Sequence, residues 1–149
     1  MKKMRGLVIV EFAIIGALLL IVLFACIEFC RATYTFAALN EGTRRAARLA
    51  AVCPLNDPKI VAAVNFMGAY GFTNSNVTVN YLGANGASLG ATPALSSVYY
   101  VQVGVTGYSM PLAIPLLSET LTSPSFTVTL PAESLGLSVS GTSSVSTAC

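Results

Sequence analysis

Glu11 is the most unusually placed acidic residue of this 149-residue chain, because it lies inside an apolar run from Leu7 to Cys30. A carboxylate in a membrane helix costs about 2.5–3.5 kcal/mol at the centre of the bilayer and less near its edge. Such a residue needs a positive partner, and a newly exposed α-amino group a few residues upstream would supply one. The alternative is a glutamate at the helix end whose side chain reaches the lipid headgroups. We interpret Glu11 as a paired, functional residue.

Other residue types that carry catalysis are scarce. The chain has no histidine, which removes the commonest general base and a frequent metal ligand. Its six acidic residues are scattered, and it contains no glycine-rich phosphate loop and no cysteine–histidine pair. The catalytic motifs that depend on histidine are therefore missing. The sequence predicts a protein that is not an enzyme and that needs no cofactor or metal.

The charged residues are few and unevenly distributed. They make up 9% of the chain, against about 25% in typical soluble domains. All eight basic residues lie at or before Lys59, and residues 60–149 carry only Glu119 and Glu133. A nucleic-acid-binding protein needs a basic face, so the sequence predicts no nucleic-acid partner.

The apolar run is long enough to cross a membrane. Residues 12–27 contain no charge and are almost wholly aliphatic. With Leu7–Val10 the run reaches the roughly 20 residues that a helix needs to span a bilayer. A buried core helix is the alternative, but a chain of this length has too little other mass to cover it on every side. The sequence predicts one membrane-spanning helix.

Other N-terminal signals share parts of this pattern. A cleaved signal peptide usually has a shorter apolar region, lacks an acid and ends in a small-x-small site. A lipoprotein signal could end at Cys26, but Phe24 is bulky for that motif, and the chain beyond Cys26 continues as an apolar helix. An uncleaved signal anchor fits the composition and stays open as the alternative.

The four cysteines occupy two environments. Cys26 and Cys30 lie on one face of the apolar helix, where packing is the expected role. Cys53 ends the helical region, and Cys149 is the last residue. A disulfide between Cys53 and Cys149 would hold the C-terminus in place and would require an oxidising, extracytoplasmic compartment. Two free thiols are the alternative.

The orientation of the membrane helix follows from two weak arguments. Three basic residues precede the span and favour a cytoplasmic N-terminus, but three arginines follow it within the distance that counts. The predicted disulfide adds weight to an extracytoplasmic C-terminal region. We therefore expect a cytoplasmic N-terminus.

The helical pattern continues beyond the apolar run. From Glu28 to Val52 the sequence is rich in alanine, and a single helix over residues 7–52 would be about 70 Å long. Gly42 interrupts it at a cost of about 1 kcal/mol. Four charged residues fall on one face of this helix: Glu41, Arg44, Arg45 and Arg48. Glu41 is placed to pair with Arg45. This face is either solvated or binds an acidic partner subunit.

A second, shorter helix and a set of strands follow. Asp57-Pro58 predicts the start of that helix, with an apolar stripe that reaches Met67 and an end at Gly71. The apolar period then changes to two, and the Ser/Thr/Gly-rich segment 138–148 predicts irregular structure or a weak edge strand. The fold class is therefore α+β, with three or four expected antiparallel strands, of which three are placed at residues 76–81, 98–106 and 125–130.

The first residues also resemble a known processing signal. Arg5-Gly6-Leu7-Val8-Ile9-Val10-Glu11-Phe12 is similar to a type IV prepilin peptidase site: a basic leader that ends in glycine, four apolar residues, a glutamate and an aromatic residue. The resemblance implies cleavage between Gly6 and Leu7. Glu11 becomes the fifth mature residue and pairs with the new N-terminus, and Phe12 belongs to the same assembly segment.

A longer stretch, from Arg5 to Ala51, resembles the TadE-like proteins of the tight-adherence (Flp) pilus system. A weaker match lies in Pro111-Leu112-Ala113-Ile114-Pro115. The resemblance implies a minor pilin or pseudopilin that helps to assemble a type IV pilus for cell adhesion. The residues that match closely are Val10-Glu11-Phe12-Ala13, Glu28-Phe29-Cys30-Arg31, Tyr34 and Arg44-Arg45-Ala46-Ala47-Arg48.

These observations together predict a leader peptide over residues 1–6, a transmembrane and extended helix over 7–52, and an extracytoplasmic, pilin-like head with a small antiparallel sheet over 53–149. The expected location is the bacterial inner membrane, crossed once, with entry into a surface pilus left open. The expected partners are that membrane, a prepilin peptidase, other pilins or pseudopilins, and the tight-adherence secretion machinery. The alternative is an uncleaved, signal-anchored binding or adhesin module outside the cytoplasm.

Overall fold

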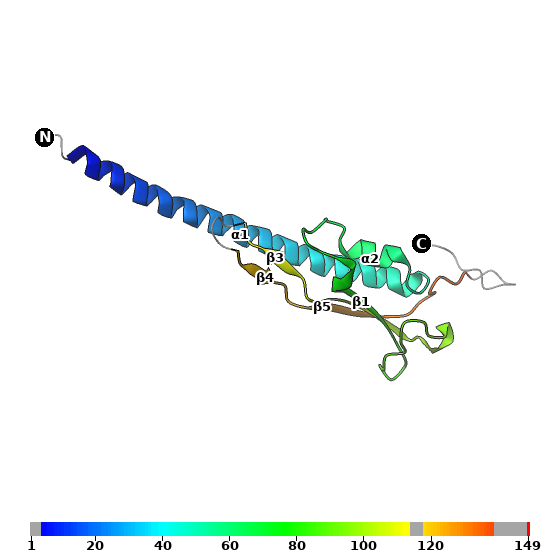
Figure 1. Ribbon diagram of the computed structural model, residues 1–149. Helices are drawn as coiled ribbons and strands as arrows, with labels where there is room; N and C mark the ends of the chain where they lie inside the picture. Colours follow the sequence, from blue (N-terminus) through cyan, green and yellow to red (C-terminus); the bar gives the residue numbers. More distant parts are fainter. Residues whose placement is uncertain (1–3, 114–117, 139–148) are drawn as a thin grey trace.

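The computed structural model describes residues 4–113, 118–138 and 149 (Figure 1). One long helix, α1 (Met4–Val52), runs through the whole molecule, and the rest of the chain gathers along its C-terminal half. A small antiparallel sheet packs against that half, so the predicted α+β class is confirmed. The apolar residues of the N-terminal half extend away from the head and are exposed.

The main sheet has three strands in the order β1-β2-β5, all antiparallel. They are β1 (Val77–Leu82), β2 (Tyr100–Val105) and β5 (Phe126–Pro131), so the three predicted strands are confirmed with small shifts at their ends. Val103 of β2 pairs with Val79 on one side and Val128 on the other. This row points toward the helix, as alternation in a half-buried sheet requires.

Two further strands were not predicted, because each is only three residues long. They are β3 (Ser109–Pro111) and β4 (Thr120–Thr122), which pair with each other as a separate two-stranded sheet. Figure 1 shows this pair beside α1, at the end of the head nearest the free half of the helix. Two short 3₁₀ turns, η1 (Asn74–Asn76) and η2 (Leu95–Ser97), precede β1 and β2.

The core lies between α1 and the three-stranded sheet. Ala46, Ala47 and Ala50 are fully buried on the helix, and Val101 and Val103 are fully buried on β2. Alanine leaves no long side chain on the helix surface, so the sheet can approach closely while its valines fill the space between. The alanine-rich composition of this part of α1 is thus explained by packing.

The second helix, α2 (Pro58–Val64), begins as predicted: the Asp57 side chain accepts a hydrogen bond of 2.8 Å from the Lys59 backbone N–H. Its predicted end was wrong, because the helix stops at Val64 rather than near Gly71. The Asn65 side chain accepts a hydrogen bond from the Ala69 N–H, a local bond that competes with helix continuation. Met67, which we expected on the buried stripe, is exposed.

The predicted disulfide joins Cys53, at the end of α1, to Cys149, 96 positions later. Cys26 and Cys30 are free and exposed on the N-terminal half of α1. Three sequence-based expectations fall outside the described residues wholly or in part. They concern the start of the leader (1–3), the last two residues of the Pro111–Pro115 motif (114–115) and most of the C-terminal Ser/Thr-rich segment (139–148).

Candidate functional site

The N-terminal half of α1 is an apolar surface that the head does not cover. Its most apolar 18-residue window has a mean hydropathy of 3.0, and none of that window is buried within the molecule. Exposed leucine, isoleucine and valine side chains continue from Leu7 to Ile27. An uncovered apolar helix of this length suggests membrane anchoring, because water would otherwise solvate its whole surface.

The predicted processing and assembly residues lie together at the free end of this helix. Gly6, Leu7, Glu11 and Phe12 are all in α1 and all exposed, Phe12 to 77%. Leu7 and Glu11 are four residues apart, so they lie on the same face of the helix. Among the side chains that the structure describes, Glu11 has no ion-pair partner. Its carboxylate is therefore available to a group outside the described chain.

A second polar feature lies where the apolar half of α1 meets the head. The Glu28 side chain is nearly buried, and its Oε2 accepts bonds from Arg31 Nη2 at 2.8 Å and from Arg31 Nε at 3.2 Å. Arg31 Nη2 also donates to the carbonyl oxygen of Pro111 in β3. This three-member contact, which we call the junction clamp (Glu28, Arg31 and Pro111), attaches the β3–β4 pair to α1.

The role of the junction clamp was not predicted, although two of its members belong to the segment Glu28-Phe29-Cys30-Arg31, which matches the TadE-like pattern. The i,i+3 spacing of Glu28 and Arg31 was the available signal, since such residues are neighbours on a helix. The third member could not be found from the sequence, because Pro111 is 80 positions from Arg31 and contributes only a backbone carbonyl.

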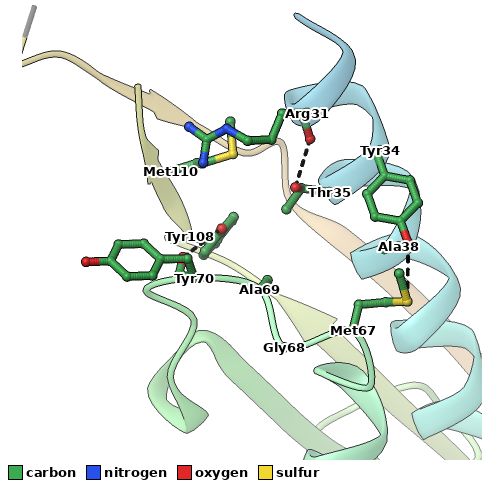
Figure 2. Close-up of a pocket in the computed structure, with 10 residues that line it drawn as sticks. All are labelled: Arg31, Tyr34, Thr35, Ala38, Met67, Gly68, Ala69, Tyr70, Tyr108 and Met110. Carbon is green, nitrogen blue, oxygen red and sulfur yellow. Dashed lines mark hydrogen bonds between the residues drawn. The ribbon is translucent and has the colours of Figure 1, made fainter. Parts of the chain in front are cut away.

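A shallow groove of about 250 Å³ lies beside the junction clamp (Figure 2). Tyr34 donates a hydrogen bond to the Met67 sulfur at 3.6 Å, and the Tyr108 hydroxyl donates to the carbonyl oxygen of Tyr70 at 3.0 Å. Burial raises the pKa of Tyr108, and the nearby charge of Arg31 opposes that shift. The remaining lining residues are Thr35, Ala38, Gly68, Ala69 and Met110.

The charged face of α1 (Glu41, Arg44, Arg45 and Arg48) lies nearer the C-terminal end of the helix. The predicted pair is confirmed, with Arg45 Nε 3.2 Å from Glu41 Oε1, and the Arg45 guanidinium also lies over the Phe66 ring at 4.2 Å. Both charged side chains are about half exposed, and pairs of this kind contribute about 0.2–1 kcal/mol. Arg44 and Arg48 are exposed on the same helix. Whether this face binds an acidic partner stays a prediction.

The predicted site residues therefore separate into two groups at opposite ends of α1. The helix rise puts Glu11 about 60 Å from Cys53, where the disulfide closes the head. The processing and assembly residues are on the uncovered end, and the disulfide is at the far end of the head. The junction clamp lies between them.

Comparison with known proteins gives one result, which concerns the first third of the chain. Residues 6–48 match the family described as TadE: TadE-like protein. No curated protein and no solved structure gave a significant match. The matched region contains the uncovered apolar helix, the helical members of the junction clamp and the charged face.

This match agrees with the resemblance found in the motifs of α1. The TadE-like family is a pilin-like structural family, not itself enzymatic, and the match is consistent with a component of a Tad pilus. Over residues 6–48, this chain is therefore TadE-like.

Proposed function

We propose that this chain is a minor pilin or pseudopilin that helps to assemble a tight-adherence pilus, after cleavage between Gly6 and Leu7. The observation that carries the proposal is the uncovered apolar half of α1, which starts directly after Arg5-Gly6 and continues without a break into the head. A helix of this kind can pack among other apolar helices while the head stays in water. The family match over the same residues supports this role.

Glu11 has a specific task in the proposed assembly. Cleavage creates an α-amino group on Leu7, one helical turn from the Glu11 carboxylate and on the same face. The amine of the same chain, or of a neighbouring one, neutralises the carboxylate when the helices pack together. Leaving a buried charge without its partner costs several kcal/mol, so the pair favours one register between subunits over the others.

The proposed orientation places the head outside the cytoplasm. The disulfide between Cys53 and Cys149 supports it, because such bonds form and persist in oxidising compartments. The protein would then wait in the bacterial inner membrane with its N-terminus on the cytoplasmic side, where a prepilin peptidase removes the leader. Other pilins or pseudopilins and the tight-adherence secretion machinery are the partners that act on it afterwards.

Processing is tested by the intact mass of the protein extracted from its native membranes. We expect a chain that starts at Leu7, and we expect Gly6→Leu to prevent cleavage because a bulky residue replaces the glycine of the leader. Gly16→Leu, a matched change farther along the same helix, should leave the mature mass changed only by the substitution. A wild-type chain that keeps Met1–Gly6 would contradict the proposal and favour the signal-anchored binding module.

The pairing of Glu11 is tested by its substitution. Glu11→Ala and the isosteric Glu11→Gln should both insert into the membrane at wild-type levels, because removing a charge favours insertion. Both should strongly reduce the number of assembled pili, counted by electron microscopy. Glu41→Ala, which removes an exposed acid on the same helix, is the control and should assemble normally. Normal piliation in the Glu11 variants would exclude the pairing.

A further inference from the structure

The end of the head nearest the apolar helix exposes several aromatic and apolar side chains. Phe29 and Tyr34 on α1 are 70% and 60% exposed, and Tyr70, in the loop after α2, is 76% exposed. Leu121 on β4 and Pro111 on β3 are also exposed. We call these five residues the proximal surface. Figure 2 shows Tyr34 and Tyr70 at the edges of the groove beside Arg31.

The position of the proximal surface along the axis of α1 follows from the junction clamp. Pro111 contacts Arg31, which is four residues beyond Ile27, the last apolar residue before Glu28. Four residues of helix correspond to about 6 Å. The polar layer on each side of a bilayer is about 5–8 Å thick, because the hydrocarbon core is about 30 Å and the whole bilayer about 40–45 Å. The β3–β4 pair therefore lies at the level of the lipid headgroups when the apolar run spans the core.

The chemistry of the proximal surface fits that layer. Tyrosine is enriched at membrane interfaces, where its ring is in contact with apolar chains and its hydroxyl stays wet. The charge of Arg31 is balanced by Glu28, and the sequence from Met110 to Ser118 contains no charged residue. Glu119, just before β4, is exposed and can stay in the hydrated part of the layer.

We propose that the proximal surface is a second membrane contact, seated in the headgroup layer of the bilayer that α1 spans. The partner is the lipid interface itself, and the contact limits how far the head can tilt about the end of the apolar helix. The inference rests on the proposed membrane insertion of this chain, and it assigns an additional role to the head.

The absence of tryptophan from the chain allows a direct test. Single tryptophans are introduced into the full-length protein, which is reconstituted in phosphatidylcholine vesicles with or without bromine on the acyl chains near the headgroups. Leu121→Trp reports on the proximal surface, and Tyr34→Trp gives a second report if the first variant does not fold. Leu19→Trp marks the apolar helix. Tyr99→Trp marks the far end of the head. The Tyr99 carbonyl accepts a hydrogen bond from the Ala132 N–H, and the next residue, Glu133, donates its N–H to the carbonyl of Ala51 near the C-terminal end of α1.

We expect Leu121→Trp to emit at shorter wavelength in vesicles and to lose a large part of its emission to brominated lipid, as Leu19→Trp does, while Tyr99→Trp keeps its emission. An unquenched Leu121→Trp beside a quenched Leu19→Trp would overturn the second contact and leave the proposed function intact. A short-wavelength but unquenched Leu121→Trp would also overturn it, because protein and not lipid would then cover the side chain. An unquenched Leu19→Trp would contradict membrane insertion itself, and both proposals with it.

Discussion

Replacing Cys149 with serine is expected to lower the free energy of unfolding of the head by about 4–5 kcal/mol in the chain-entropy account of disulfides, in which a loop of about 100 residues corresponds to about 4.7 kcal/mol. The bond joins positions 96 apart and therefore restricts almost the whole head in the unfolded state. It also holds the last residue of the chain against the end of α1. Cys53 is fully buried, and its thiol is tolerated there as a small apolar group.

The measurement is denaturant unfolding of the full-length chain in detergent micelles, followed by the near-ultraviolet signal of its six tyrosines. A reductant added to the wild type should reproduce the shift of the midpoint seen in Cys149→Ser. Cys26→Ser and Cys30→Ser are the matched controls, since both thiols are free and exposed, and they should unfold like the wild type. A midpoint that is unchanged by Cys149→Ser would show that the bond does not stabilise the head.

Features that depend on local pattern could be predicted from the sequence. The uninterrupted apolar run and the alanine-rich segment after it predict one long helix, because both keep a helical period without proline. Alternating valines predict the strands of the main sheet, since one face is packed and the other is solvated. The disulfide followed from a cysteine count: the last residue of the chain is one of only two cysteines outside the apolar helix.

Features that depend on distant contacts could not be predicted. Arg31 contacts a backbone carbonyl of β3, and a carbonyl has no signature in the sequence. The strands β3 and β4 are too short to show a period of two. The stop of α2 at Val64 depends on Asn65, whose side-chain bond to the Ala69 N–H ends a pattern that by periodicity alone continues to Met67. In each case a tertiary or side-chain contact overrides the local preference.

Gly42 is the residue whose expected effect on stability differs most between the sequence and the structure. From the sequence it is a weak point in α1, and replacing it with alanine should stabilise an isolated helix by about 1 kcal/mol. In the structure Gly42 is buried where α2 packs against α1. A Cβ added there would overlap the Val64 backbone, with 2.9 Å to the carbonyl carbon and 3.1 Å to Cα. Backbone atoms cannot rotate away as a side chain can, so α2 would have to move.

Gly42→Ala is therefore expected to destabilise the head by about 1–3 kcal/mol, the usual range for overpacking, instead of stabilising it. Gly42→Val should have a larger effect, because it adds two more methyl groups at the same contact. The control is Gly16→Ala in the same helix, where nothing lies within 4 Å of the added Cβ. Denaturant unfolding in micelles compares the three variants with the wild type. A more stable Gly42→Ala would mean that α2 can separate from α1 at no cost, and that Gly42 is not required for the packing of the two helices.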